Sequence, residues 1–193
     1  MPEQTQPIVF LKGMQVMLRP LLKEDIPLLL KWINDPEVRQ YLASYLPMME
    51  ADEEEWLEKL HTRKPMDIVL GIMVDGSLIG TIGLHTIDWR HRTATTGTLI
   101  GEKTCWGKGY GTEAKMLLLH YAFNTLNLRK ICSSVLAFNE RSLRYALKCG
   151  YAEEGRRREH HFRDGRYWDE ILLAVFRDDW QPLWEEFAKE RGI

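Results

Sequence analysis

An Asp-Gly pair between two runs of strand-forming residues places the strongest constraint on the fold of this chain. Segment 67–88 reads DIVLGIMVDGSLIGTIGLHTID, and its two β-rich runs meet at Asp75–Gly76. Asp-Gly favours the two-residue turn whose backbone twist matches an antiparallel pair of strands. Segment 93–102, TATTGTLIGE, is also β-rich and follows closely. We therefore expect a three-stranded antiparallel meander between residues 67 and 102.

The segments before this meander are predicted to be mostly helical. A short strand at Met14–Arg19, ended by Pro20, precedes a helix at Leu21–Trp32, in which apolar residues recur at helical spacing. Segments 34–42 and 51–61 contain few strong β-formers. The second of them begins with acidic residues, which suit the positive end of a helix dipole. The region from residue 21 to the meander should therefore be helical.

The second half of the chain alternates between helical and strand patterns. The expected elements are a helix at Thr112–Leu126, a strand at 130–137, a helix at 139–149 ended by Gly150, a second hairpin turning at Asp164–Gly165 and a final helix at Trp180–Arg191. The chain of 193 residues contains no internal repeat or long linker. We expect one domain, residues 1–193, of the α+β class, with a central mixed, mostly antiparallel twisted sheet flanked by helices on both faces.

Composition excludes several classes of partner. A formal net charge of −2 and a pI near 6.3 provide no bulk attraction for nucleic acid or for an anionic membrane. No stretch approaches the roughly 18 apolar residues that cross a bilayer, and the first residues lack the pattern of a signal peptide. The three cysteines form no CxxC pair and are expected to be reduced. These features predict a cytoplasmic protein that binds neither nucleic acid nor membrane.

Segment 105–114, CWGKGYGTEA, places glycines at 107, 109 and 111, between a predicted strand and a predicted helix. Bare backbone N–H groups at a helix N-terminus bind phosphate, although a permissive turn before a core helix is the alternative. A Walker loop is excluded because Lys108 is followed by Gly109 rather than by Ser or Thr. A dinucleotide-binding loop fits poorly because Thr112 stands where its third glycine is required. An anion site of another kind is therefore favoured.

The remaining interpretation is a resemblance to a known family. Segments 98–123, TLIGEKTCWGKGYGTEAKMLLLHYAF, and 139–151, NERSLRYALKCGY, resemble the GNAT superfamily of acetyl-CoA-dependent N-acetyltransferases. The similarity is greatest to the branch that contains the ribosomal-protein N-terminal acetyltransferases. The family signature Q/R-x-x-G-x-G/A aligns with residues 106–111, with Trp106 in place of the usual Gln or Arg. Segments near both ends, WINDPEVRQYL and FRDGRYWDEILLAVFRDDW, also resemble the family.

The resemblance implies that acetyl-CoA is the acyl donor and that no metal is needed. It places the pantetheine arm beside the backbone of Leu99, Ile100 and Gly101, where one N–H would polarise the thioester carbonyl. It assigns the pyrophosphate to Trp106, Gly107, Lys108, Gly109, Tyr110, Gly111 and Thr112, and a hydrogen bond to the pantetheine or phosphate region to Asn139. His160 and His161 are adjacent, so on a regular strand they would face opposite sides and could not easily share a metal ion.

Two residues are candidates for proton transfer. Glu102, beside the glycine motif, is the preferred base acting through water, with an exposed strand-end carboxylate as the alternative. Many family members carry a tyrosine seven residues after the asparagine to protonate the departing thiolate, but that residue is Ala146 here. Tyr145 lies about 100° around the helix and is expected to point elsewhere. The branch suggests Ser142 instead, which could equally be a helix residue that contacts backbone.

The predicted reaction is direct attack of a primary amine on acetyl-CoA. A protein N-terminal α-amine has a pKa of about 7.7–8.0, against about 10.4 for lysine, so it needs only a modest base and is the preferred acceptor. The alternative acceptors are polyamines, aminoglycosides and amino acids. For a polyamine, the acidic residues from Glu50 to Glu58 could form a groove, although a solvent-facing helix surface is the favoured interpretation. A non-catalytic acyl-CoA-binding module and a homodimer also stay open.

Overall fold

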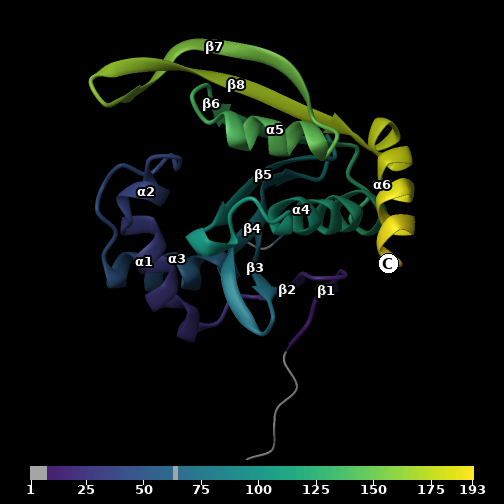
Figure 1. Cartoon of the computed structure of the whole chain (residues 1–193), viewed down its shortest axis with the longest axis horizontal. Helices are drawn as coiled ribbons and strands as arrows, with labels where there is room; N and C mark the ends of the chain where they lie inside the picture. Colours follow the sequence, from purple (N-terminus) through teal and green to yellow (C-terminus); the bar gives the residue numbers. More distant parts are fainter. Residues whose placement is uncertain (1–7, 63–64) are drawn as a thin grey trace, which may run out of the picture.

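The computed structural model describes residues 8–62 and 65–193 as a single mixed sheet with helices packed on it (Figure 1). The first seven residues lie outside the described residues. They belong to the N-terminal segment in which the sequence shows no signal-peptide pattern. Eight strands pair in the order β1-β2-β3-β4-β5-β6-β8-β7. Their bounds are Leu11–Lys12, Met17–Pro20, Ile68–Val74, Ser77–Asp88, Thr93–Ile100, Lys130–Leu136, Ala152–Arg163 and Arg166–Phe176 for β1 to β8.

The predicted meander is confirmed as β3, β4 and β5. Asp75 and Gly76 form the β3–β4 turn, both with positive φ (48° and 77°), as a two-residue hairpin turn requires. All neighbouring strands of the sheet are antiparallel except β5 and β6, which are parallel. The mixed, mostly antiparallel α+β fold predicted from the sequence is therefore confirmed.

The region from residue 21 to the meander is helical, as expected. It contains a short 3₁₀ turn at Lys23–Asp25 and helices α1, α2 and α3 at Ile26–Asn34, Pro36–Arg39 and Glu50–Thr62. The strand predicted at Met14–Arg19 begins later, at Met17, because residues 13–16 form the turn between β1 and β2. The Glu113 carboxylate holds this turn by accepting the backbone N–H groups of Gln15 (2.8 Å) and Val16 (3.1 Å).

The remaining helices are α4 at Tyr110–His120, α5 at Glu140–Lys148 and α6 at Arg177–Arg191. Residues 113–119 of α4 are all buried, so this helix is covered on more than one side. The helix predicted to run to Leu126 instead ends at His120 and continues as a π-helical turn at Tyr121–Thr125. Helix α6 begins three residues before its predicted start, directly after β8.

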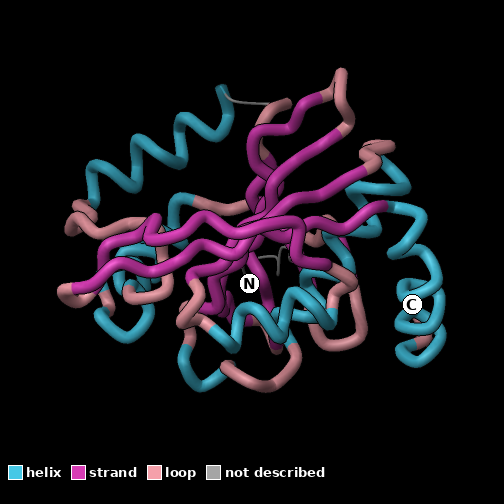
Figure 2. Tube along the Cα trace, turned by 90° about the horizontal axis from the view of Figure 1, so that it is seen from above, coloured by secondary structure: helices cyan, strands magenta, loops and turns pink. Residues whose placement is uncertain are grey.

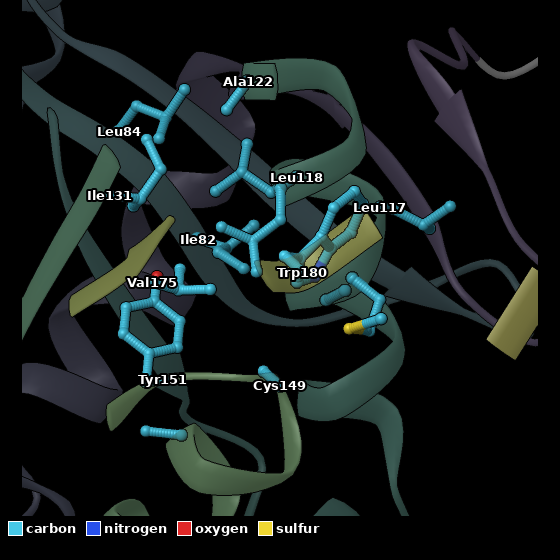
Figure 3. Close-up of a cluster of buried hydrophobic side chains, with 14 of the residues drawn as sticks. Ile82, Leu84, Leu117, Leu118, Ala122, Ile131, Cys149, Tyr151, Val175 and Trp180 are labelled. Atoms are coloured by element: carbon cyan, nitrogen blue, oxygen red, sulfur yellow. The ribbon is translucent and has the colours of Figure 1, made fainter. Parts of the chain in front are cut away.

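Helices cover both faces of the sheet. Neighbouring residues of β4 point to opposite faces: Ile79 joins a large core with α4 and α6, whereas Leu78 joins a smaller core with α1 and α2. Figure 3 shows part of the large core, where Leu118 of α4 lies over Ile82 of β4 and near Trp180 of α6. The predicted arrangement of helices on two faces is therefore confirmed.

The long β7–β8 hairpin extends from α6 toward α2, as Figure 2 shows from above. Near its tip, the Arg163 guanidinium donates to the backbone carbonyls of Arg39 (3.3 Å) and Leu42. The hairpin is thus tied to the loop that follows α2. Among the described helices, none is both long and apolar enough to cross a bilayer.

Candidate active site

The parallel strands β5 and β6 separate after a short contact. Their pairing is limited to Thr93–Thr95 against Lys130–Cys132. One residue further along, the Ser133 hydroxyl still donates a hydrogen bond to the Thr96 carbonyl (3.2 Å). Beyond it, Gly97–Ile100 and Ser134–Leu136 diverge and line opposite sides of a cavity of about 730 Å³. The fold therefore opens a gap inside its own sheet, with strand backbone on both walls.

The cavity joins the two faces of the sheet through this gap. On β8, Ile171 and Leu173 point into the core with α4. Because neighbouring residues of a strand point to opposite faces of the sheet, Glu170, which precedes Ile171, points to the other face. Helix residues Lys115 and Tyr145 line the cavity on the α4/α5 face. A ligand could therefore be held on the α4/α5 face and react at the Glu170 face.

The glycine motif is an open cradle at the N-terminus of α4. Gly107 and Gly109 have φ of +76° and +87°, and nothing lies within 4 Å of where a Cβ would stand. No side chain caps the helix, so the N–H groups of its first turn are left for a ligand. Bare N–H groups at the positive end of a helix dipole form an anion site. The cradle is therefore a candidate site for a phosphate group.

Most of the residues predicted for the cofactor line this cavity. They are Leu99, Ile100, Trp106, Gly107, Gly109, Tyr110, Gly111, Thr112 and Asn139. Gly101 and Lys108 do not line it. The Gly101 N–H donates to the Ile79 carbonyl (2.9 Å), and a Cβ at Gly101 would meet the Trp32 ring at 2.0 Å. Gly101 is therefore required for packing behind the cavity.

Trp106, which replaces the polar residue of the signature, has a defined structural role. Its indole N–H donates to the Ile100 carbonyl (2.7 Å), which closes the turn between β5 and the glycines. The Arg141 guanidinium carbon lies 4.0 Å from the centre of its ring. Trp106 thus holds a cation, Arg141, beside the cradle by a cation–π contact.

The α4/α5 face of the cavity is cationic. Four basic residues line it: Lys115, Arg141, Arg144 and Lys148. None of the four belongs to the glycine motif or to the predicted catalytic residues. Three of them follow Asn139 on α5 at positions 141, 144 and 148, and this helical spacing is the signal in the sequence that places them on neighbouring turns. Together with the glycine cradle, these charges favour a ligand that carries several phosphates.

Asn139 and Ser142 lie together at the start of α5. Asn139 is the N-cap of the helix, and its Oδ1 accepts the Ser142 backbone N–H (3.1 Å). Within the described part of the chain, no hydrogen bond engages the Asn139 Nδ2, so it can donate to a ligand. Both residues line the cavity. Asn139 and Ser142 therefore lie side by side at the cavity wall, and their predicted roles toward the cofactor remain predictions.

Glu102, the predicted base, lies outside the cavity. Its carboxylate accepts hydrogen bonds from the Thr104 hydroxyl (3.0 Å) and backbone N–H (3.4 Å), so it caps the 3₁₀ turn at Lys103–Cys105. Glu102 is thus a half-buried residue at a strand end whose carboxylate caps a turn.

The expectation that Tyr145 points elsewhere is wrong. Its hydroxyl lies 3.0 Å from the Thr98 Oγ1 on β5, and its ring lines the cavity. The Tyr145 side chain therefore reaches from α5 to the end of β5 that borders the gap. Burial and then the neighbouring Cys149 raise the pKa of Tyr145 well above its ordinary value, so its hydroxyl stays protonated.

Lys115 is a buried amine on the same wall. Only 2% of it is exposed, and its Nζ lies 5.6 Å from the ring centres of Tyr145 and Tyr151. Burial lowers the pKa of Lys115 to about 8, while the nearby Cys149 acts weakly in the opposite direction. The low-polarity surroundings therefore leave a substantial neutral fraction of this amine at mildly basic pH.

The Glu170 face contains a compact group of polar side chains. The Arg157 guanidinium donates to Glu170 Oε2 (2.7 Å), and the His160 and His161 Nε2 atoms lie 3.8 and 3.5 Å from the same carboxylate. Partial burial opposes ionisation of Glu170, but polar contacts from Ser134, Arg157 and His161 lower its pKa. Glu170 is therefore a carboxylate at the end of the cavity.

The expectation that His160 and His161 face opposite sides is also wrong. Three residues of β7, 158–160, stand opposite one residue of β8, because the register changes between Arg157 and His161. Within this bulge Glu159 has φ of +49°, and its N–H donates to Asp169 Oδ1 (2.9 Å). The bulge interrupts the two-residue alternation and turns both imidazoles toward Glu170.

Comparisons with known proteins agree with this geometry. A family model described as the acetyltransferase (GNAT) domain matches residues 15–152. Spermidine N(1)-acetyltransferase of Escherichia coli is 29% identical over 164 residues, which is 84% of this chain and 86% of that protein. YdaF of Bacillus subtilis, provisionally named as a ribosomal N-acetyltransferase, is 33% identical over 59% of this chain and 62% of its own length.

A solved structure is similar over almost its whole length. The spermidine N-acetyltransferase from Vibrio cholerae, in complex with CoA and spermine, superposes with a TM-score of 0.80 at 26% identity. The match covers 86% of this chain and 98% of that one. The mixed sheet with its flanking helices is thus shared with an enzyme whose structure contains CoA.

Proposed function

The chain belongs to the GNAT family of acetyltransferases, and we propose that its acceptor is the α-amine of a protein N-terminus. The chain is an acetyl-CoA-dependent N-acetyltransferase, so the open question is which amine it acetylates. The proposal depends on the charge of the cavity on its Glu170 face. Glu170 is the one carboxylate residue that lines the cavity among the described residues, and it already pairs with Arg157.

A polyamine carries several positive charges that need acidic partners along its length. The acidic helix α3 does not provide them. Of its described residues, Trp56 lines the cavity and the acidic ones do not. A peptide N-terminus carries one charge, which a single carboxylate can accept. Spermidine is the second candidate, because similar proteins of Escherichia coli and Vibrio cholerae are named for it.

The residues on the α4/α5 face would hold the cofactor. We assign its phosphates to the backbone N–H groups of the glycine cradle and to Arg141, Arg144 and Lys148, and its pantetheine arm to the exposed backbone of β5 and to Asn139 Nδ2. Bound acetyl-CoA supplies the activated acetyl group as a thioester. An N–H of the β5 edge beside the gap would polarise the carbonyl of that group.

The proton steps need little assistance for this acceptor. An α-amine with a pKa of about 7.7–8.0 is partly neutral at physiological pH, so no strong base is required. Glu170 would orient the amine by accepting one of its N–H groups. Ser142 remains our candidate to donate a proton to the leaving sulfur, and the protonated Tyr145 hydroxyl is a second donor on the same wall.

Release of free thiol from acetyl-CoA tests the acceptor. We expect short peptides with a free N-terminus to be acetylated with kcat/KM at least about 100-fold higher than spermidine or an aminoglycoside, a difference of about 2.7 kcal/mol. The matched control is the same peptide with a blocked N-terminus and its lysines intact, which should release no thiol. Equal or faster turnover of spermidine would refute the peptide proposal. Tight acetyl-CoA binding without thiol release from any amine would identify a non-catalytic module.

A further inference from the structure

We propose that His160, His161 and Glu170 form a binding site for a divalent transition-metal ion of the zinc class. The three ligand atoms, two imidazole nitrogens and a carboxylate oxygen, lie within 4.8 Å of one another. They belong to two adjacent strands, and none of them is needed to hold acetyl-CoA. The site is therefore distinct from the cofactor site on the α4/α5 face.

The distances suit a metal ion. The His161 and His160 Nε2 atoms lie 3.5 and 3.8 Å from oxygens of Glu170. Hydrogen bonds between nitrogen and oxygen are shorter, at about 2.7–3.2 Å. Two ligands that each bind zinc at about 2.0–2.1 Å in a tetrahedron lie about 3.4 Å apart. The 3.5 Å between His161 Nε2 and Glu170 Oε1 is thus near the ligand–ligand spacing of a zinc site, whereas the 3.8 Å from His160 Nε2 is measured to the other oxygen, Oε2.

The backbone is shaped to bring these ligands together. A regular strand would separate the two imidazoles, and the β7 bulge removes that separation. The bulge adopts a left-handed backbone at Glu159, which is uncommon for a residue other than glycine, and it is fixed by the hydrogen bond to Asp169. The imidazole rings meet edge to face, with centres 5.0 Å apart.

Arg157 orients the carboxylate. Its guanidinium binds Oε2, and Oε1 is the oxygen nearest His161. Ligating carboxylates in metalloproteins usually receive such a hydrogen bond on the oxygen that does not bind the metal. Arg157 can therefore fix Glu170 in place while Oε1 binds an ion. Two imidazoles and one carboxylate are donors that zinc and its neighbours in the first transition series prefer.

Three protein ligands leave one coordination position open, and it would face the cavity, because His161 and Glu170 line it. An ion there would add positive charge where, under our proposed function, the acceptor amine enters. We therefore expect metal binding to exclude the acceptor without displacing acetyl-CoA. This consequence rests on the proposed function, whereas the metal site itself does not.

Cobalt(II) titration of the full chain, without a histidine tag, tests the site. We expect saturable binding of one ion, with the intense visible bands of a four- or five-coordinate cobalt centre, and loss of these bands when zinc is added. His160→Ala and, separately, His161→Ala should weaken cobalt binding by at least about 100-fold, since each removes a ligand. The matched control is His91→Ala, which removes an exposed histidine far from the cluster in sequence and should leave the affinity unchanged.

Several outcomes would overturn the proposal. The first is a cobalt spectrum identical to that of the free ion. The second is equal affinity in His160→Ala and the unmodified chain. The third is the appearance of thiolate-to-metal charge-transfer bands, which would show that a cysteine binds the ion. Circular dichroism and acetyl-CoA affinity show whether each variant is folded. If the chain proves inactive on peptides, the proposed function fails but the cobalt spectrum still decides the metal site. If peptides are acetylated, zinc should raise the KM for the peptide and leave the acetyl-CoA affinity unchanged.

Discussion

At the scale of single residues, Gly109 carries the clearest expectation about cofactor binding. Gly109→Asp places a negative charge and a side chain in the cradle, where phosphate is proposed to bind. We expect the Kd for acetyl-CoA to rise at least about 100-fold, measured by calorimetry. Gly165→Asp is the matched control, because Gly165 also has positive φ (+77°) and open space but lies at a hairpin tip. If both variants bind alike, the cradle does not hold the cofactor.

The buried Lys115 should make the free energy of unfolding depend on pH. Burial lowers its pKa in the folded chain to about 8, below the 10.5 of an exposed lysine, so below pH 8 the charged amine opposes folding by about 3 kcal/mol. This penalty disappears as pH rises from about 8 to 10.5. Lys115→Met should therefore be more stable than the unmodified chain at pH 7, and the difference should shrink by pH 10.

Urea denaturation at several pH values measures this difference. Lys148→Met is the control, because Lys148 also lines the cavity but is exposed on α5. It should change the free energy of unfolding little at any pH. A stability gain of Lys115→Met that stays constant from pH 7 to pH 10 would contradict the assignment of the penalty to a buried charge.

At the scale of elements, the turn between β1 and β2 depends on one side chain of α4. Glu113 is 2% exposed and accepts two backbone N–H groups of that turn. Glu113→Ala leaves both donors unsatisfied and should cost about 2–4 kcal/mol of unfolding free energy, with Glu113→Gln costing less because it keeps an acceptor oxygen. Faster hydrogen exchange at Gln15 and Val16 would locate the effect.

The control for this prediction is Glu186→Ala, which removes an exposed glutamate of α6. It should change stability by less than about 0.5 kcal/mol. If Glu113→Ala has no larger effect than this control, the carboxylate does not hold the turn.

Elements with strong local signals could be predicted, and those set by packing could not. The Asp75–Gly76 turn and the glycine motif are each marked by residue types that are compatible with few other local structures, because both adopt positive φ. The β7 bulge has no such signal, because the left-handed backbone of Glu159 is accompanied by a hydrogen bond to Asp169 on the partner strand, a contact that exists only in the folded chain. Reasoning from strict alternation therefore placed the two histidines on opposite faces. Tyr145 was misplaced for a similar reason, since the position of α5 over β5 decides where its hydroxyl lies.

At the scale of the whole molecule, the fold class could be predicted from the sequence, and so could most of the cavity wall formed by the glycine motif and Asn139. The resemblance pointed to residues 106–112 and Asn139, and all of these except Lys108 line the cavity. The opposite face could not be predicted. It is built by Glu170 and His161 from β8 and β7, together with the loop after α2, and these segments meet only in the folded chain.

The separation of charge between the two faces also has a kinetic consequence. The chain as a whole is slightly anionic, with a net charge of −2, yet three exposed basic residues of α5, Arg141, Arg144 and Lys148, line the α4/α5 opening, whereas Glu170 at the other face is paired with Arg157. Such a local field accelerates the diffusion of a polyanion toward its opening and slows that of a cation. Acetyl-CoA association, followed by stopped flow, should slow steeply with added salt, while its dissociation rate should change less. The two substrates would thus approach by separate routes, and neither needs to leave before the other arrives.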